Sequence, residues 1–185
     1  MGKLTFLIGG ARSGKSSHAQ KLAEQSGVSV TFIATAQALD DEMSTRIQKH
    51  QQERPASWVT LEIPFDIASK LDSLQTEVVI LDCATLLVSN LMMKFIENDL
   101  VDEKKSMQAV RVEIEELLSH IRQHKQNWII ISNEVGLGLV PPYQMGRVYR
   151  DLLGWVNQQL AREADEVFWM VAGIPVPIAQ FRNLS

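Results

Sequence analysis

The segment GGARSGKS, residues 9–16, constrains the fold of this chain more than any other stretch. It has the spacing G-x-x-x-x-G-K-[ST], follows the apolar run LTFLI and precedes a helical pattern. Glycines let successive backbone N–H groups point into one concavity, and the N-terminus of the next helix adds positive potential. The segment therefore predicts a strand–loop–helix unit that binds phosphate. The alternative, a glycine turn with an incidental lysine, does not explain the strand before it and the helix after it.

The individual residues of this loop have separate expected roles. We expect Lys15 to neutralise the β- and γ-phosphate oxygens of a nucleoside triphosphate, and the Ser16 hydroxyl to coordinate Mg²⁺. The nucleotide-binding residues predicted from the loop are Gly9, Gly10, Ala11, Arg12, Ser13, Gly14, Lys15 and Ser16. The motif indicates the ligand but does not say which reaction follows.

Short apolar runs alternate with longer amphipathic runs along the rest of the chain. The predicted strands are residues 3–8, 28–34, 58–63, 78–82, 128–132 and 166–171. The predicted helices are residues 15–25, 40–53, 65–74, 85–96, 103–125 and 144–163. Several of these strands are apolar throughout rather than alternating, which is typical of strands covered on both faces. The pattern predicts an α/β fold, a mostly parallel sheet with helices on both faces, in a single domain of residues 1–185.

Composition excludes some classes of function. With 18 Lys and Arg against 22 Asp and Glu, the net charge is −4, and no basic block indicates a nucleic-acid partner. The apolar runs are shorter than the roughly 18 residues of a membrane span, and the first one is too short for a signal peptide. Cys83 is the single cysteine, so an intrachain disulfide is excluded. We therefore expect a reducing, cytoplasmic location.

An acidic residue ends the apolar run VVILD. At the carboxyl end of a buried strand, Asp82 is expected to face the ligand at the edge of the sheet. There it would hold Mg²⁺ through water, as the acidic residue of the second nucleotide motif does. The alternative is a capping role for a helix that starts near Ala84.

His50 lies within the predicted helix 40–53. On a helical wheel it shares one side with Met43, Ile47 and Arg46. The wheel alone favours a partly buried structural histidine. The second interpretation is a nucleophile or base directed at the nucleotide, with Arg46 or Arg54 stabilising phosphate charge, since a neutral imidazole is a good nucleophile toward phosphorus.

The other histidines give weaker signals. His120 and His124 are four residues apart on the predicted helix 103–125, a spacing that suits a metal. No third ligand accompanies them, so we expect a solvated helix face. His18 lies one turn into the helix after the phosphate loop and is expected to be structural.

Five blocks of this sequence resemble, in order, the bifunctional adenosylcobinamide kinase/adenosylcobinamide-phosphate guanylyltransferase family of cobalamin biosynthesis. They are GGARSGKS, residues 33–64 with RIQKHQQERP, LDCATLLVSNL, residues 132–167 beginning SNEVG, and AGIP. The resemblance spans nearly the whole chain and implies a RecA-like P-loop NTPase core that forms a homotrimer, with the nucleotide site near a subunit boundary. It also implies Mg²⁺ as cofactor, ATP and GTP as substrates, and adenosylcobinamide and its phosphate as partners.

The resemblance implies two reactions. The first phosphorylates adenosylcobinamide, and the second transfers GMP from GTP through a guanylylated histidine to give adenosylcobinamide-GDP and pyrophosphate. The histidine of R-I-x-x-H-x-x-x-R-P corresponds to His50. Relatives often have Glu where Asp82 stands here, which would move the metal contact. A P-loop small-molecule kinase without guanylyl transfer, and a GTP-binding switch or assembly module, are the alternatives.

The resemblance also implies further site residues. Those expected to touch nucleotide are Ala34, Thr35, Ala36, Gln51, Gln52, Glu53 and Arg54. Glu62 can pair with the N1–H and N2–H₂ donors of guanine, which adenine lacks; the alternative is a surface carboxylate. Asn133 and Glu134 are candidates for Mg²⁺ or substrate contact. Arg147 and Arg150 are expected either to contact phosphate or a neighbouring subunit, or to lie on a helix surface.

Overall fold

The computed structural model describes residues 2–38, 40–52, 54–71 and 74–184. Within these ranges, seven strands form one sheet in the order β3-β2-β4-β7-β1-β8-β9. All neighbours are parallel except β8 and β9, which are antiparallel. The strands are β1 Leu4–Gly9, β2 Val30–Ala34, β3 Val59–Glu62, β4 Val78–Asp82, β7 Asn127–Asn133, β8 Glu166–Val171 and β9 Ile174–Pro177. The predicted mostly parallel sheet is confirmed.

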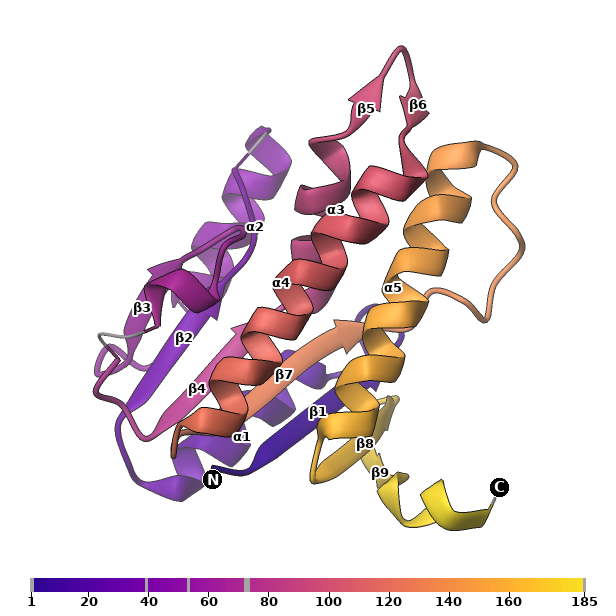
Figure 1. Ribbon diagram of the computed structural model, residues 1–185. Coiled ribbons are helices and arrows are strands. Elements are labelled where there is room, and N and C mark those ends of the chain that lie inside the picture. The colour runs from indigo at the N-terminus through magenta and orange to yellow at the C-terminus, as the bar shows by residue number, and fades with distance from the viewer. Residues whose placement is uncertain (1, 39, 53, 72–73, 185) are drawn as a thin grey trace.

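Helices cover both faces of the sheet, as predicted (Figure 1). The helices are α1 Lys15–Ser26, α2 Asp41–Gln52, α3 Ala84–Met93, α4 Glu103–Gln123 and α5 Gln144–Glu163. Phe6 and Ile8 of β1 face the core under α3, α4 and α5, whereas Leu7 faces the core under α1. Because both faces are buried, the strand is apolar at nearly every position, with the buried Thr5 as its one polar side chain.

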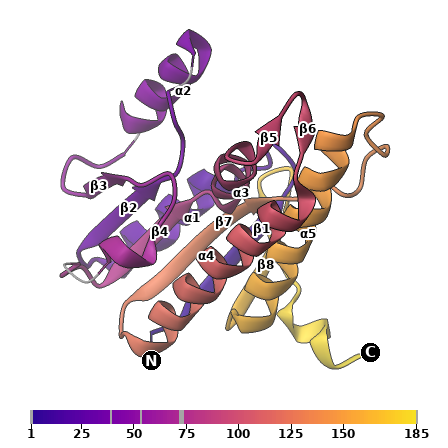
Figure 2. The ribbon, with the colours of Figure 1, turned by 45° about the horizontal axis from the view of Figure 1, so that its top comes forward.

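Helix α2 stands apart from these two layers. Figures 1 and 2 both show it beyond the carboxyl edge of the sheet, above β2 and β3. Its mean hydropathy is low, and its residues are largely charged or amide side chains. A helix of this composition has little apolar surface to bury, so it projects from the core instead of packing across the sheet.

The predicted helix 65–74 is wrong. The described residues of this segment contain only a short 3₁₀ helix, η1, at Ala68–Lys70. The reason lies outside the segment: the Glu113 carboxylate of α4 accepts hydrogen bonds from the backbone N–H groups of Asp66 (2.8 Å) and Ile67 (2.9 Å). In addition, Asp66 has φ of 55°, which no α-helix accommodates. A distant side chain therefore fixes a backbone that the local pattern assigned to a helix.

The prediction also missed two hairpins. The helix expected at residues 85–96 ends at Met93, and a hairpin of β5 Ile96–Glu97 and β6 Leu100–Val101 follows. Its two turn residues, Asn98 and Asp99, both have positive φ, which is typical of the two-residue turns that join antiparallel strands. The turn between β8 and β9 is of the same kind, at Ala172 and Gly173. A second 3₁₀ helix, η2, spans Ala179–Leu184.

His120 does not lie on a solvated helix face, so that prediction is wrong. It is buried, stacks on His124 with ring centroids 3.8 Å apart, and meets the Trp128 ring edge-on at 6.4 Å. It follows the buried Leu117 by three residues and therefore shares its helix face. His18 packs edge-on against Phe168 at 5.9 Å.

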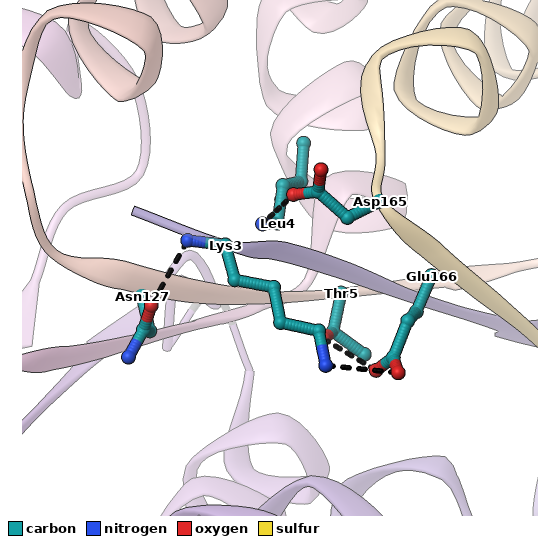
Figure 3. A network of polar contacts seen from close by, with 6 residues as sticks. All are labelled: Lys3, Leu4, Thr5, Asn127, Asp165 and Glu166. Atoms are coloured by element: carbon teal, nitrogen blue, oxygen red, sulfur yellow. Dashed lines mark hydrogen bonds and ion pairs between the residues drawn. The ribbon is translucent and has the colours of Figure 1, made fainter. Parts of the chain in front are cut away.

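Polar contacts fix β1 at the amino edge of the sheet, opposite the phosphate loop (Figure 3). The Lys3 N–H donates to Asn127 Oδ1 (2.9 Å), and the Leu4 N–H donates to Asp165 Oδ2 (2.7 Å). The Lys3 ammonium pairs with Glu166 at 2.8 Å. These contacts hold the start of β1 in register between β7 and β8. In the described part of the chain, no helix is long and apolar enough to cross a membrane.

Candidate nucleotide site

The phosphate loop joins β1 to α1, as the motif predicts. Gly14 has φ of 93° at the start of α1, a backbone conformation that favours glycine. Gly9 also needs the absence of a side chain, because a Cβ there would lie 2.4 Å from the Met170 carbonyl oxygen. The Lys15 ammonium donates to the carbonyl oxygens of Gly9 (3.0 Å) and Gly10 (2.6 Å), so the lysine closes the loop over its own backbone.

Two opposed electrostatic effects act on the pKa of the Lys15 ammonium. The residue is 7% exposed, and this burial lowers the pKa of its ammonium, while the negative potential of Cys83 and Asp82 acts in the opposite direction. A buried cation of this kind is stabilised when an anion replaces its carbonyl partners. A nucleotide phosphate is such an anion.

The predicted site residues at the strand ends lie side by side at one edge of the sheet. Ala34 of β2 is the register partner of both Glu62 on β3 and Asp82 on β4. Gly9, at the end of β1, is the register partner of Asn133 on β7. Because all these strands are parallel, their carboxyl ends form a single row, which is where open α/β sheets bind ligands.

Two cavities open along this row and share Ser16, Met43, Asp82 and Leu86 as walls. The first, here called the β3-side lobe, has a volume of about 120 Å³. The other residues of this lobe that matter to its chemistry are Ala34, Ala36, Ile47, Arg54 and Glu62. The second, here called the β7-side lobe, has a volume of about 460 Å³ and is lined by residues 11–17 of the phosphate loop together with Thr85 and Asn133. The phosphate loop therefore borders the larger lobe, whereas α2 borders both lobes, through Met43 in the larger one and through Met43 and Ile47 in the smaller one.

Ser16 and Asp82 are suited to hold a divalent cation between the lobes. Helix α3 begins at Ala84 with Cys83 in the N-cap position, so Asp82 is not the capping residue of the alternative interpretation. Mg²⁺ is usually held by one or two carboxylates together with phosphate oxygens and water. Among the described residues, no group of three or more His, Cys, Asp and Glu gathers as a metal site. The residues present thus fit a cation that binds together with the nucleotide.

Thr35 has a different role from its neighbours. Ala34 and Ala36 line the β3-side lobe, whereas the buried Thr35 hydroxyl donates to the Cys83 carbonyl (2.8 Å) and accepts from the Cys83 N–H (2.9 Å). Asn90 of α3 was not predicted as a site residue, and its amide Nδ2 donates to the carbonyls of Thr35 (2.8 Å) and Pro64 (3.0 Å). An amide in the apolar stretch LLVSNL was the available signal. These bonds hold the ends of β2, β3 and β4 together at the carboxyl edge of the sheet.

The last turn of α2 is attached to the sheet edge at the β3-side lobe. Gln51 Nε2 donates to Glu62 Oε1 at 2.8 Å. The Arg54 guanidinium lies over the Phe32 ring at 3.8 Å and lines the lobe. Its Nε and Nη1 atoms are buried and find no hydrogen-bond partner among the described residues. Burial lowers the pKa of Arg54, against the opposite effect of Asp82 and Glu62. This cation is suited to bind an anionic ligand.

Position 50 lies in this same last turn of α2. It follows Met43 by seven residues and Ile47 by three, and both of these side chains line the β3-side lobe. These spacings place position 50 on the lobe side of the helix backbone. The side chains of His50 and Arg46, and all of Glu53, lie outside what the structure describes. The direction of the imidazole therefore stays a prediction. Gln52 is exposed at the end of the helix.

The candidates near the long loop 134–143 divide into two groups. Asn133 lines the β7-side lobe, but the Glu134 carboxylate turns to the Gly136 N–H of its own loop. Arg147 Nη1 donates to the carbonyls of Pro141 (3.1 Å) and Pro142 (2.9 Å), so it braces this loop. Arg150 pairs with Asp151 on the surface of α5. Of the two arginines, neither lines the β3-side or the β7-side lobe.

Comparisons with known proteins agree with this geometry. The family model described as cobinamide kinase / cobinamide phosphate guanyltransferase matches residues 5–178. The chain is 41% identical over 180 residues to the bifunctional adenosylcobalamin biosynthesis protein CobU of Escherichia coli K12, covering 95% of this chain and 99% of that protein. It is 41% identical over 176 residues to the bifunctional adenosylcobalamin biosynthesis protein CobP of Pseudomonas aeruginosa, covering 94% and 95%.

A solved structure supports the fold. The RadB recombinase superposes with a TM-score of 0.50 over 90% of this chain and 73% of that one, at 13% identity. This likeness concerns the fold alone and agrees with the predicted RecA-like P-loop NTPase core. The family match and the two relatives show that the chain is an enzyme and belongs to the cobinamide kinase / cobinamide phosphate guanyltransferase family.

Proposed function

We propose that this enzyme phosphorylates adenosylcobinamide with ATP or GTP and then transfers GMP from GTP to the product, giving adenosylcobinamide-GDP and pyrophosphate. The main support for the proposal is that three parts, the phosphate loop, Asp82 and the last turn of α2, lie around two adjoining cavities. The phosphate loop and Asp82 line both lobes, and the last turn of α2 borders the β3-side lobe. A kinase alone would need the first two parts, whereas guanylyl transfer also needs the third.

In the phosphoryl-transfer step the chain binds and orients the triphosphate. The N–H groups of the loop surround the phosphates, and the Lys15 ammonium leaves its carbonyl partners for the β- and γ-oxygens. Ser16 and Asp82 would hold Mg²⁺, which supplies positive charge to these oxygens when bound. The residues that hold the phosphates stabilise the charge that develops during transfer, and this is the main source of catalysis in such reactions.

In the guanylyl-transfer step His50 is the proposed nucleophile. A neutral imidazole nitrogen bonds to the α-phosphorus of GTP, and the bond from that phosphorus to the pyrophosphate oxygen breaks. The other ring nitrogen keeps its proton, so the adduct is a guanylyl-imidazolium. A phosphate oxygen of cobinamide phosphate then attacks the same phosphorus, the P–N bond breaks, and the imidazole is restored.

The β3-side lobe offers a reason for guanine selectivity. Glu62 can accept from both N1–H and N2–H₂ of guanine, and Gln51 fixes the Glu62 carboxylate through its Oε1 atom. Gln52, Glu53 and Arg54 follow in the chain and would line the ribose and phosphates. The Arg54 Nε and Nη1 atoms, buried without a hydrogen-bond partner in the described part of the chain, are suited to the α-phosphate.

The proposal includes an assembly and a location. We propose a homotrimer in the cytoplasm that acts without a nucleic-acid partner. Exposed apolar side chains in the loop 134–143, namely Leu137, Leu139 and Val140, support a subunit contact or a corrinoid contact there. The acidic composition supports the absence of a nucleic-acid partner. The single cysteine, Cys83, which is free, supports the cytoplasmic location.

The test uses GTP labelled at the α-phosphate, with denatured protein analysed for bound label. Wild-type protein should retain label and His50→Ala should retain none, whereas His124→Ala, a control just after the distant helix α4, should match the wild type. A P-loop kinase without guanylyl transfer, or a GTP-binding switch, would leave no label on the wild-type protein. Equal labelling of the wild type and His50→Ala would also contradict the proposal.

A further inference from the structure

The end of β7 brings to the phosphate loop a side chain that the mechanism above does not use. Asn133 is the last residue of β7, and its backbone pairs in register with Gly9, the last residue of β1. Its side chain lines the β7-side lobe together with the phosphate loop and Asp82. The hydrogen bonds between Asn133 and other side chains of the described chain all use its backbone. The carboxamide therefore faces the lobe with its donor and acceptor groups available.

The backbone of Asn133 is held firmly in place. Its N–H donates to Thr85 Oγ1 at 2.7 Å, and its carbonyl accepts from Asn157 Nδ2 at 3.0 Å. Thr85 and Asn157 are both 6% exposed, so these bonds are made inside the protein between β7, α3 and α5. Tyr149 of α5 adds a bond to the Thr85 carbonyl at 3.3 Å. These bonds fix the backbone from which the carboxamide extends, and a fixed attachment point limits the positions that a hydrogen-bond donor can take.

Asn133 lines only the β7-side lobe and Arg54 only the β3-side lobe, whereas Met43 of α2 borders both. The Lys15 ammonium donates to the carbonyl of Gly9, so it lies one strand away from Asn133. Lysine in this motif binds the β- and γ-phosphates, which places the γ-phosphate on the Asn133 side. The β3-side lobe, which holds Arg54, is lined by the ends of β2, β3 and β4, and Asp82 at the end of β4 lies between this lobe and the end of β7. The two reacting phosphorus atoms would thus face different lobes.

We infer that Asn133 is a catalytic residue of the phosphoryl-transfer step alone, and that GMP transfer takes place in the β3-side lobe without it. The inference rests on the proposed function. In this step the bond from the γ-phosphorus to the bridging oxygen breaks, a bond to the substrate hydroxyl oxygen forms, and the hydroxyl proton passes to solvent. The Asn133 amide donates to an oxygen of the transferred group. A neutral amide does so without the repulsion that a carboxylate would bring.

The experiment compares two rates in Asn133→Ala and in the wild type: transfer of label from γ-labelled GTP to cobinamide, and self-guanylylation by α-labelled GTP. We expect phosphoryl transfer to fall about 100-fold and self-guanylylation to change by less than about threefold, as for the loss of one transition-state donor. Retained self-guanylylation also shows that the variant is folded. Asn133→Asp keeps the shape of the side chain and should slow phosphoryl transfer at least as much, because its charge repels the γ-phosphate.

A matched control is available on the same strand. Asn127, the first residue of β7, lies at the opposite end and bonds to the Lys3 N–H (Figure 3). Asn127→Ala should leave both rates unchanged. Equal loss of both reactions in a folded Asn133→Ala variant, or no change in phosphoryl transfer, overturns the inference. A wild-type protein that performs neither reaction overturns the proposed function instead.

Discussion

Replacing Glu113 tests why the segment at residues 65–74 does not form the predicted helix. Glu113 is 5% exposed, and its carboxylate accepts from two backbone N–H groups at 2.8 and 2.9 Å. Each hydrogen bond to a charged group contributes about 1.5–3 kcal/mol, so Glu113→Ala should destabilise the protein by about 3–6 kcal/mol. Glu113→Gln keeps one acceptor oxygen and should lose about half of that.

The measurement is urea unfolding followed by circular dichroism, supported by thermal unfolding. For a chain of this size each kcal/mol lowers the melting temperature by roughly 2–4 °C, so Glu113→Ala should melt roughly 6–24 °C below the wild type. Glu115→Gln, an exposed change on the same helix, is the control and should have little effect. If Glu113→Ala is no more destabilising than this control, the explanation of the segment is wrong.

The effect of replacing Glu113 on the free energy of unfolding should depend on pH. Burial raises the pKa of Glu113 above its ordinary value of 4.5, and this outweighs the lowering by its two N–H partners. A carboxyl group whose pKa rises on folding stabilises the folded state at low pH, and that contribution is lost as the pH rises through the folded-state pKa. The stability gap between the wild type and Glu113→Gln should therefore narrow as the pH rises from about 4.5. A gap that widens with pH would contradict this assignment.

Three further predictions concern the site. Lys15→Met should slow both reactions by about 100-fold or more, measured with γ- and α-labelled GTP, because the cation that replaces carbonyl partners with phosphate is lost. Asp82→Asn should raise the Mg²⁺ concentration needed for half-maximal phosphoryl transfer, since one charged ligand is removed; an unchanged Mg²⁺ titration would exclude Asp82 as a ligand. Asn90→Ala should cost about 1–3 kcal/mol in urea unfolding and weaken GTP binding by calorimetry, because Thr35 and Pro64 lose a shared donor.

Most of the fold could be predicted from the sequence because its signals are local. The continuous apolar runs identify the buried strands, and the phosphate loop fixes the order of strand, loop and helix at the start. The hairpin turn Asn98–Asp99 was also a readable local signal, which the helical pattern before it obscured. The contact of Glu113 with residues 66 and 67 was not readable, since it joins segments that only the tertiary structure brings together.

In the candidate site, too, some features follow from the local sequence and others depend on tertiary contacts. The phosphate-loop residues and Asp82 lie at one edge of the sheet because motif spacing and strand ends determine their positions. The contacts of Asn90 and the use of the Thr35 hydroxyl by Cys83 depend on how three strand ends meet, which spacing does not encode. Position 50 combines both cases: its place on α2 is local, whereas the approach of that helix to Glu62 is tertiary.

The most direct test of the account is to locate the GMP adduct on the protein by peptide mass spectrometry after incubation with GTP and Mg²⁺. The account predicts a single adduct on the peptide that contains His50, stable in alkali and released in acid, as a phosphoramidate on imidazole should be. An adduct on Lys15 or another residue, or a protein that forms cobinamide-GDP with no adduct at all, would contradict the central role given to the last turn of α2.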